Sequence, residues 1–411
     1  MKLPYLLALF FVSLAFTSHA NSVDLLDVKK FPKWFQDSYV QEAQLVDTTE
    51  IIIEQFNIKQ EVLGNIKLLA DKEGIWLYHI NFGTKTPIEC YVLTSHSGPA
   101  NSMYAMMESG LDDIATLNKK KLSASFNFSL GTGVIGDTPY LQLDTLYHLG
   151  KGKKKASGIL KALAAETDDG LLLCLHNSIG YRKTFYTAFE SFVKAFIANK
   201  PSKAFFNPVY QYTFNDIPVG YSSEKYIVDA DGDVEISNSV AMMIPSDASS
   251  ISRTDSTSNS WSYADGSLIN ASSYSIENGE LSSRFNILFE DEQWKVVGEL
   301  QGKNVETSLN HKERLLSDFG NYLKVIELKS SDNNSSIDNL WNADIDPVSA
   351  VEVKFSKVAG DDSANTKYQV GPLSMKLLTD SNGVIKQASM DQAGLKLNVK
   401  LMYVKGMPQL P

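Results

Sequence analysis

The spacing of apolar residues predicts a sheet-forming region in the first half of the chain. Short apolar runs alternate with polar turns between Gly64 and Asn177, which is typical of antiparallel strands joined by short loops. Apolar residues recur at helical spacing along Gly98–Leu117 and again from Arg182 to Ala198, so each of these segments is predicted to be a helix with one buried face. We therefore expect an N-terminal antiparallel sheet covered by helices.

The pattern changes after Ala198. Two prolines in Ala198–Pro208 end the helical spacing. Beyond them, turns such as "DADGD" and "IENGE" separate alternating runs, which predicts hairpins of a second sheet. The polar stretch "SSISRTDSTSNSWSY" indicates either solvated strands or a long polar excursion. We expect an α+β protein with two domains, 21–199 and 200–411, the second being mostly antiparallel β with one packed helix over residues 312–328.

The first 20 residues have the features of a secretory signal. Lys2 precedes an apolar run from Leu3 to Phe16, and the small residues Ser18 and Ala20 stand where a signal peptidase requires them. The run is shorter than the roughly 20 residues of a membrane-spanning helix. No cysteine is near the cleavage site to carry a lipid. We expect a periplasmic protein that is exported with removal of residues 1–20, is not a lipoprotein and has no membrane span.

The charge balance of the chain limits the classes of molecule that it is expected to bind. The chain has 38 lysines and arginines against 48 aspartates and glutamates, a formal net charge of −10. Nucleic acid is a poor partner on this balance, because phosphate binding needs clustered cations. One basic cluster stands out, formed by Lys151, Lys153, Lys154 and Lys155. It is either a solvated hairpin tip or a small patch for an anionic partner.

The stretch "GTGVIG", Gly131–Gly136, matches the dinucleotide-binding pattern G-x-G-x-x-G. That pattern binds a pyrophosphate only where a helix follows at once and offers its N-terminal amides. Here Pro139 and a strand-like alternation follow, so we expect the glycines to connect two strands. The motifs G-x-S-x-G, H-E-x-x-H and C-x-x-C are absent from the sequence, and we expect no cofactor, no metal and no motif-based catalytic site.

An enzymatic function is an alternative that the sequence leaves open. Four histidines fall in the first half of the chain after the signal, namely His79, His96, His148 and His176. If they converged with a carboxylate in a pocket, they would form the site of an envelope hydrolase without a sequence motif.

Cys90 and Cys174 carry the most specific chemistry of the sequence. They are its only cysteines, and both fall in predicted strands of the first sheet. Because an exported chain meets an oxidising compartment, we expect them to form a disulfide if their strands are neighbours. Two buried, unpaired thiols are the alternative.

Two stretches resemble known families. The turn Asp168–Gly170, the strand "LLLCLHN" and the helix "SIGYRKTFYTAFESFVKAFIAN" resemble the last strand and helix of PsbP-like modules. This resemblance implies an α/β/α sandwich used for binding rather than catalysis. The later meander with one helix resembles LolA-type and LppX-type half-barrels in the order of its elements, which implies a carrier of acyl chains.

Together these observations predict a non-enzymatic binding or accessory protein of the cell envelope. Its partner would be an envelope protein or an apolar small molecule. A periplasmic carrier of a lipid or another apolar ligand is the first alternative, and the hydrolase is the second.

Overall fold

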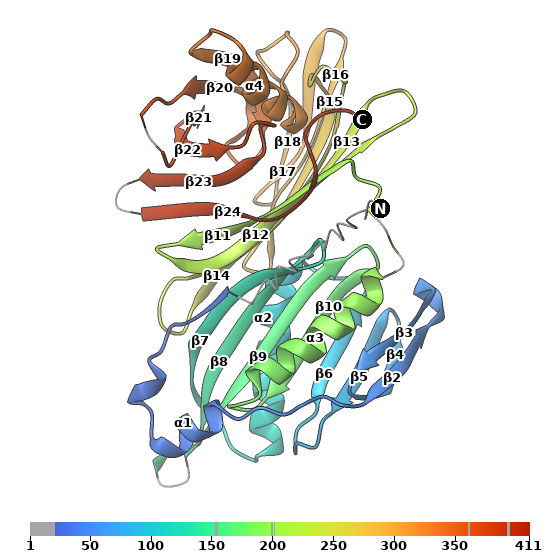
Figure 1. Ribbon diagram of the computed structural model, residues 1–411, viewed down its shortest axis with the longest axis vertical. Coiled ribbons are helices and arrows are strands. Elements are labelled where there is room, and N and C mark those ends of the chain that lie inside the picture. Colours follow the sequence, from blue (N-terminus) through green and yellow to red (C-terminus); the bar gives the residue numbers. More distant parts are fainter. Residues whose placement is uncertain (1–20, 153–154, 199, 201, 361, 393–394) are drawn as a thin grey trace, which may run out of the picture.

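Two large antiparallel sheets organise the protein (Figure 1). The computed structural model describes residues 21–152, 155–198, 200, 202–360, 362–392 and 395–411, so the predicted signal, residues 1–20, lies outside the described residues. Strands account for 56% of the structure and helices for 16%. The expected α+β class is therefore wrong, and the fold is mostly β.

The first sheet has eight strands in the order β1-β7-β8-β9-β10-β6-β5-β4. They are β1 (Asn21–Asp24), β4 (Asn65–Lys72), β5 (Ile75–Asn81), β6 (Ile88–Leu93), β7 (Leu122–Ile135), β8 (Thr138–Leu149), β9 (Ala156–Thr167) and β10 (Gly170–Asn177). A separate ribbon pairs β2 (Thr48–Ile53) with β3 (Ile58–Leu63). The helices of this part are α1 (Lys33–Tyr39), α2 (Pro99–Leu117) and α3 (Arg182–Ile197), with short 3-10 helices at Val28–Lys30 and Glu54–Phe56.

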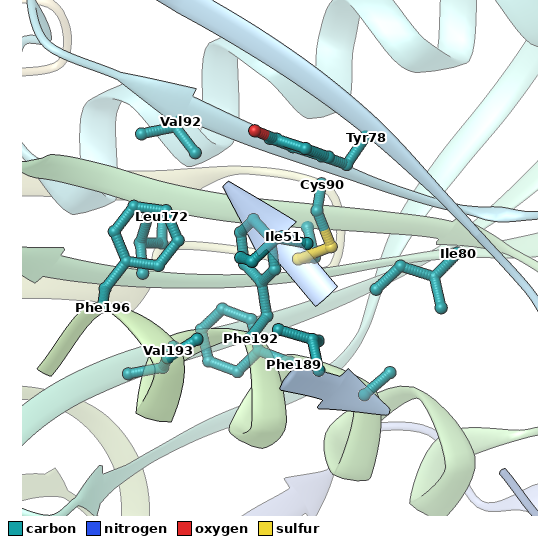
Figure 2. Close-up of a cluster of buried hydrophobic side chains, with 14 of the residues drawn as sticks. Ile51, Tyr78, Ile80, Cys90, Val92, Leu172, Phe189, Phe192, Val193 and Phe196 are labelled. Carbon is teal, nitrogen blue, oxygen red and sulfur yellow. A yellow bond between two sulfur atoms is a disulfide. The ribbon is translucent and has the colours of Figure 1, made fainter. Parts of the chain in front are cut away.

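Helices cover only part of this sheet, which is why the expectation of a helix-covered sheet fails. On one face, the Phe189, Phe192 and Phe196 rings of α3 share a core with the β2–β3 ribbon (Figure 2). On the other face, α2 shares its core with the second sheet, through residues such as Tyr221 and Met243. Strands therefore bury much of the surface that the sequence analysis assigned to helices.

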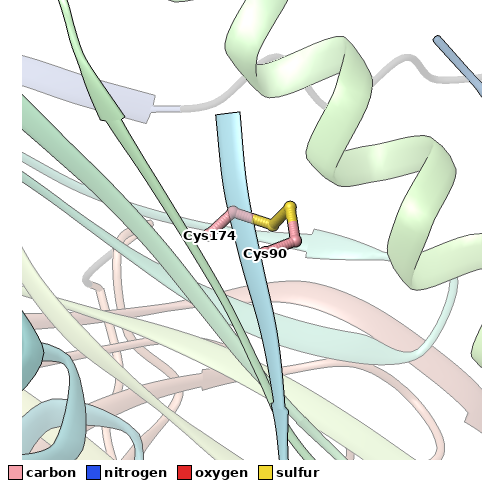
Figure 3. The surroundings of a disulfide bond; sticks show 2 residues. All are labelled: Cys90 and Cys174. Atoms are coloured by element: carbon pink, nitrogen blue, oxygen red, sulfur yellow. A yellow bond between two sulfur atoms is a disulfide. The ribbon is translucent and has the colours of Figure 1, made fainter. Parts of the chain in front are cut away.

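Cys90 and Cys174 lie directly opposite each other on β6 and β10 (Figure 3). Their sulfur atoms are bonded, and both side chains are fully buried beneath α3. The neighbouring strands that the prediction required are thus present. That the bond forms in the exported protein remains a prediction.

The second sheet has 14 strands in the order β18-β17-β16-β15-β14-β13-β12-β11-β24-β23-β22-β21-β20-β19. They are β11 (Phe206–Phe214), β12 (Ile217–Val228), β13 (Val234–Pro245), β14 (Ile251–Ser262), β15 (Leu268–Glu277), β16 (Glu280–Glu290), β17 (Gln293–Leu300), β18 (Lys303–Ser308), β19 (Ser335–Asn342), β20 (Asp346–Lys357), β21 (Thr366–Val370), β22 (Leu373–Thr379), β23 (Ile385–Gln392) and β24 (Leu395–Gly406). The polar stretch after Ser249 forms β14, so the alternative of solvated strands is the one realised.

This sheet curls on itself, and the segment before α4 (Asp318–Ser330) closes the ring. Leu316 bridges to Ser267 at the start of β15 and to Leu340 on β19. The helix lies inside the curl, packed on both of its sides (Figure 1). It begins at Asp318 rather than at residue 312, because Ser317 caps it by accepting a hydrogen bond from the Gly320 N–H and the preceding residues are paired in an extended conformation.

The glycines of "GTGVIG" lie at the end of β7 and in the turn to β8, and a strand follows them, as predicted. Gly133 faces Tyr140 across this hairpin, and a Cβ atom at Gly133 would meet the Tyr140 hydroxyl at 2.4 Å. The glycine is therefore needed for packing between the strands.

Among the described helices, none combines the length and apolar character needed to cross a membrane.

Candidate ligand-binding hollow

The curled sheet encloses a hollow of about 210 Å³ beside α4. Strands β11, β12 and β13 form one wall, strands β20 to β24 form the other, and α4 closes the space between them. Five tyrosines line it, Tyr210, Tyr212, Tyr226, Tyr322 and Tyr368. Such a concentration of hydroxyl groups inside a curled sheet makes this space the strongest candidate site in the described residues.

Strand register gathers the polar side chains on the inner face. Glu224 on β12 lies directly opposite Asn238 on β13, and Tyr210 on β11 lies opposite Ser222. Ser222, Glu224 and Tyr226 are spaced two residues apart, so they point to the same face of β12. The alternation of the strand thus places a carboxyl group among tyrosine rings.

Glu224 is the centre of a hydrogen-bond network. Its Oε2 atom accepts from the Tyr226 hydroxyl at 2.7 Å and from the Tyr322 hydroxyl at 3.1 Å. The Tyr322 hydroxyl lies 2.9 Å from the Tyr210 hydroxyl. A phenol has one proton, so while Tyr322 donates to Glu224, Tyr210 must donate to Tyr322. Three tyrosines on three elements are thereby oriented around one carboxyl group.

Burial raises the pKa of Glu224 to about 7, against a usual value of 4.5. The Tyr226 and Tyr322 hydrogen bonds oppose this shift, whereas the nearby Asp318 carboxyl adds to it. Desolvation also raises the pKa of Asp318, although this residue is exposed to solvent. Neither carboxyl group forms an ion pair with a lysine, arginine or histidine in the described part of the chain.

Other polar atoms here lack partners as well. Asn238 and Asn321 both line the hollow, and the side-chain oxygen of each is buried without a hydrogen bond. A buried acceptor without a donor costs about 1–3 kcal/mol, so native proteins rarely keep several together without a purpose. The remaining wall is apolar and consists of Val325, Phe355, Met375, Leu377, Ile385 and Val399, with Ala388 among them.

A second hollow lies between the two sheets, and its two lysines are paired with carboxyl groups. Lys225 donates to Asp168 at 2.9 Å, and Lys200 forms an ion pair with Asp169. These charged groups therefore satisfy one another, which makes this space a weaker candidate for a ligand than the hollow beside α4.

The four histidines do not converge on one site. In the described residues no two of them share a partner: His79 lies beside Glu89, His96 beside Glu166, His148 beside Ser157, and His176 among the rings of Phe82, Tyr181 and Phe185. Burial lowers the pKa of His176 to about 2, so this residue stays neutral. One of the four, His96, does line a hollow together with the carboxyl groups of Glu166 and Asp255, so the hydrolase stays an untested alternative.

A cluster of buried charges in the first sheet holds the N-terminal segment. Lys161 and Asp144 face each other on β9 and β8, and the Arg182 Nε atom lies 3.3 Å from Asp144. The same guanidinium lies 2.9 Å from the Asp24 carboxyl. The Lys161 ammonium donates to the carbonyl oxygens of Ser178 and Gly180. Lys161 and Asp144 are enclosed by protein and offer no surface to a ligand, whereas Asp24 is exposed at the edge of the cluster, so the cluster positions chain segments.

The predicted lysine patch lies at the turn between β8 and β9. Lys151 and Lys155 are exposed there, whereas Lys153 and Lys154 lie outside the described residues.

The described residues contain no cluster of three or more histidine, cysteine, aspartate or glutamate side chains that could hold a metal ion.

The residues of the hollow were missed by the sequence analysis. Glu224 stands in a strand pattern that also fits a solvated face, and Asp318 stands at a helix start, where an acidic residue is ordinary. The available signal was the alternation of Glu224 with Tyr226 and with the apolar Val228 in a strand flanked by tyrosine-rich β11. Only the curl of the sheet brings Glu224 to α4.

The protein shows limited similarity to known proteins in sequence and in structure. No protein-family model matches the chain, and no curated protein matches its sequence. Among solved structures, it is similar to a β-barrel-like protein with a domain of unknown function, DUF1849, from Brucella abortus, at 13% identity and a TM-score of 0.38, over 50% of this chain and 99% of that one. It is also similar to a DUF1089 family protein from Pseudomonas aeruginosa, at 14% identity and a TM-score of 0.27, over 40% of this chain and 87% of that one. Neither comparison supports the resemblance to PsbP-like modules.

Proposed function

We propose that the protein is an exported, non-enzymatic binding protein of the cell envelope that holds a small molecule in the hollow beside α4. The observation that carries this proposal is the set of polar groups gathered next to an apolar wall: the desolvated Glu224 carboxyl group, which has no ion-pair partner in the described residues, and the side-chain oxygens of Asn238 and Asn321, which accept no hydrogen bond. Placing such groups together lowers the stability of the empty protein, and a ligand that satisfied them would recover it.

Export is part of the proposal. It is supported by the sequence pattern of residues 1–20 and by the pairing of the only two cysteines, which suits an oxidising compartment. A mature chain beginning at Asn21 in the periplasm is what this proposal expects, and the intact mass of protein isolated from its host would test it.

The size of the hollow favours a small ligand over a lipid. Its volume of about 210 Å³ is below the roughly 300–1,000 Å³ of sites for drug-sized molecules. Much of the apolar inner face of the sheet is covered by the protein itself: Ile287 on β16, a candidate for contact with an acyl chain, is 1% exposed and packs with Leu309 and Leu315. An acyl chain would have to displace this packing.

Mass spectrometry of the gently purified protein under native conditions tests the proposal. We expect a copurifying small molecule, and we expect Val399→Trp, which fills the hollow from β24, to lose it. Tyr274→Trp, at an exposed position on β15, serves as the control for introducing an indole. If wild-type protein carries no small molecule and a fragment screen by ligand-observed NMR finds no binder that Val399→Trp abolishes, the hollow is not a binding site.

A further inference from the structure

We infer that the ligand of this hollow is a protonated primary or secondary amine with an apolar body. This inference rests on the proposed function, because it names the chemistry of the molecule that the same site would hold. It follows from three features of the lining: carboxyl groups without a cationic side chain beside them, a set of aromatic faces and an apolar end.

Several hydrogen-bond acceptors of the lining are directed to the hollow or already bound by its tyrosines. The Tyr226 and Tyr322 hydroxyl protons are directed to Glu224, so these phenols have none left for a ligand. The carboxyl group of Asp318 forms no ion pair in the described residues, and the side-chain oxygen of Asn321 is buried without a partner. A ligand that complements these acceptors brings donors of its own.

The charge of the lining has one sign. Glu224 and Asp318 are close enough to raise the pKa of Glu224 through their repulsion, and no lysine, arginine or histidine lines the hollow among the described residues. Asp318 is exposed to water, so the electrostatic argument applies to the desolvated Glu224: a buried charge is ordinarily paired with a charge of opposite sign, because an isolated charge is costly in a low-dielectric environment. A cationic ligand would supply that missing charge, whereas an anion would add to the repulsion.

Aromatic rings add a second attraction for a cation. Tyr226 and Tyr322 lie with their ring centroids 5.9 Å apart and nearly perpendicular, and Phe355 and Tyr368 lie 5.2 Å apart on the opposite wall. The face of such a ring attracts a cation within about 6 Å of its centroid, most strongly where water is excluded. A quaternary ammonium would use the rings but would leave the acceptors unsatisfied. An N–H-bearing ammonium uses both.

The other end of the ligand would meet side chains without polar atoms. Leu377 on β22 and Ala388 on β23 are directly opposite each other in register, and Val399 on β24 is opposite Ala388. All three line the hollow. The site therefore favours an amphipathic molecule whose ammonium group lies near Glu224 and whose hydrocarbon part lies against these strands.

Three probes of equal length test the inference: hexylammonium, 1-hexanol and hexanoate, titrated at pH 8 into the purified protein by isothermal calorimetry. We expect hexylammonium to bind at least about tenfold more tightly than hexanol, because a charge-assisted hydrogen bond and cation–π contacts are added. We expect hexanoate to bind more weakly than hexanol. Glu224→Gln should remove the preference for the ammonium, while Glu235→Gln, on the adjacent strand but pointing to the other face of the sheet, should keep it.

The outcomes separate the two proposals. If hexanol binds as tightly as hexylammonium and Val399→Trp abolishes both, the hollow is a binding site without preference for an amine, so the inference is wrong and the proposed function stands. If hexylammonium does not bind, the inference is overturned, and the copurification experiment decides the proposed function separately. Should Glu224→Gln fail to fold, the comparison of the three probes on the wild-type protein still decides.

Discussion

The carboxyl group of Asp255 caps the N-terminal end of α2 through its hydrogen bonds with Asn101. Its Oδ2 atom accepts from the backbone N–H of Asn101 at 2.8 Å and from the side-chain amide of Asn101 at 2.7 Å, and its Oδ1 atom accepts from the Ala100 N–H at 2.9 Å. Asp255 is on β14 of the second sheet, whereas α2 packs on the first. Gly98 permits this approach, because a Cβ atom there would lie 2.3 Å from Asp255.

Asp255→Ala should therefore destabilise the protein by about 2–4 kcal/mol, because it leaves two backbone N–H groups of α2 buried without acceptors. Asp255→Asn keeps one acceptor and should cost less. The free energy of unfolding in urea measures both effects, with Asp112→Ala, at an exposed position of the same helix, as the control. A cost below about 0.5 kcal/mol for Asp255→Ala would contradict the importance of this contact.

The bond between Cys90 and Cys174 should contribute substantially to stability. The two residues are separated by 84 positions, and closing a loop of that length stabilises the folded state by roughly 4–5 kcal/mol in the chain-entropy model. We expect the melting temperature to fall when the protein is reduced. In protein isolated from its compartment, alkylation without reductant should label neither cysteine. Quantitative labelling of both would mean that the thiols are unpaired, which is the alternative left open by the sequence.

Gly133→Ala should destabilise the β7–β8 hairpin by about 1–3 kcal/mol, since the added Cβ atom would overlap the Tyr140 side chain, which is fully buried and has little room to move. The Tyr140 hydroxyl is the nearest atom, so the cost of Gly133→Ala should be smaller in a Tyr140→Phe background. Urea denaturation of the two single variants and the double variant measures this coupling. An equal cost in both backgrounds would show that the hydroxyl is not the obstacle.

Local patterns predicted individual elements well. The helix expected from Arg182 to Ala198 is α3, and its four phenylalanines face the sheet, because residues spaced three and four apart share one face of a helix. The strands that contain Cys90 and Cys174 were also expected, and they are neighbours. These features depend on residues close together in the sequence, which is the information that periodicity contains.

Features that depend on distant segments were not predicted. Leu315 and Leu316 continue the apolar stripe of α4 in the sequence, but pairing with Leu268 and with Asn339 holds them in an extended conformation. The ring closure that this pairing completes also creates the hollow. Glu224 is one of many polar residues in the second sheet, and nothing near it in the sequence indicates that Tyr322, 98 residues later, donates to it.

The final prediction concerns pH. The pKa of Glu224 is raised from 4.5 to about 7 in the folded protein, so between these values the folded state binds a proton that the unfolded chain has released. The free energy of unfolding should therefore fall across this window as the pH rises, by an amount on the order of 1–3 kcal/mol for this group. Glu224→Gln removes the titration but keeps an acceptor for a tyrosine hydroxyl. We expect the variant to resemble wild type near pH 4 and to be more stable at pH 8.

The difference between the variant and the wild-type protein is the quantity to follow, because other groups titrate in the same range and contribute equally to both. Urea denaturation at intervals from pH 4 to pH 8 measures it. Glu235→Gln, on the opposite face of β13, is the matched variant for the loss of a carboxyl group outside the hollow. The contrary outcome is a stability difference between Glu224→Gln and wild type that is the same at pH 4 and at pH 8. In that case ionisation of Glu224 does not destabilise the protein, and the protein alone satisfies the carboxylate. A gain in stability at pH 8 would mark Glu224 as a residue that is kept at a cost to folding, as expected of a group that serves a ligand.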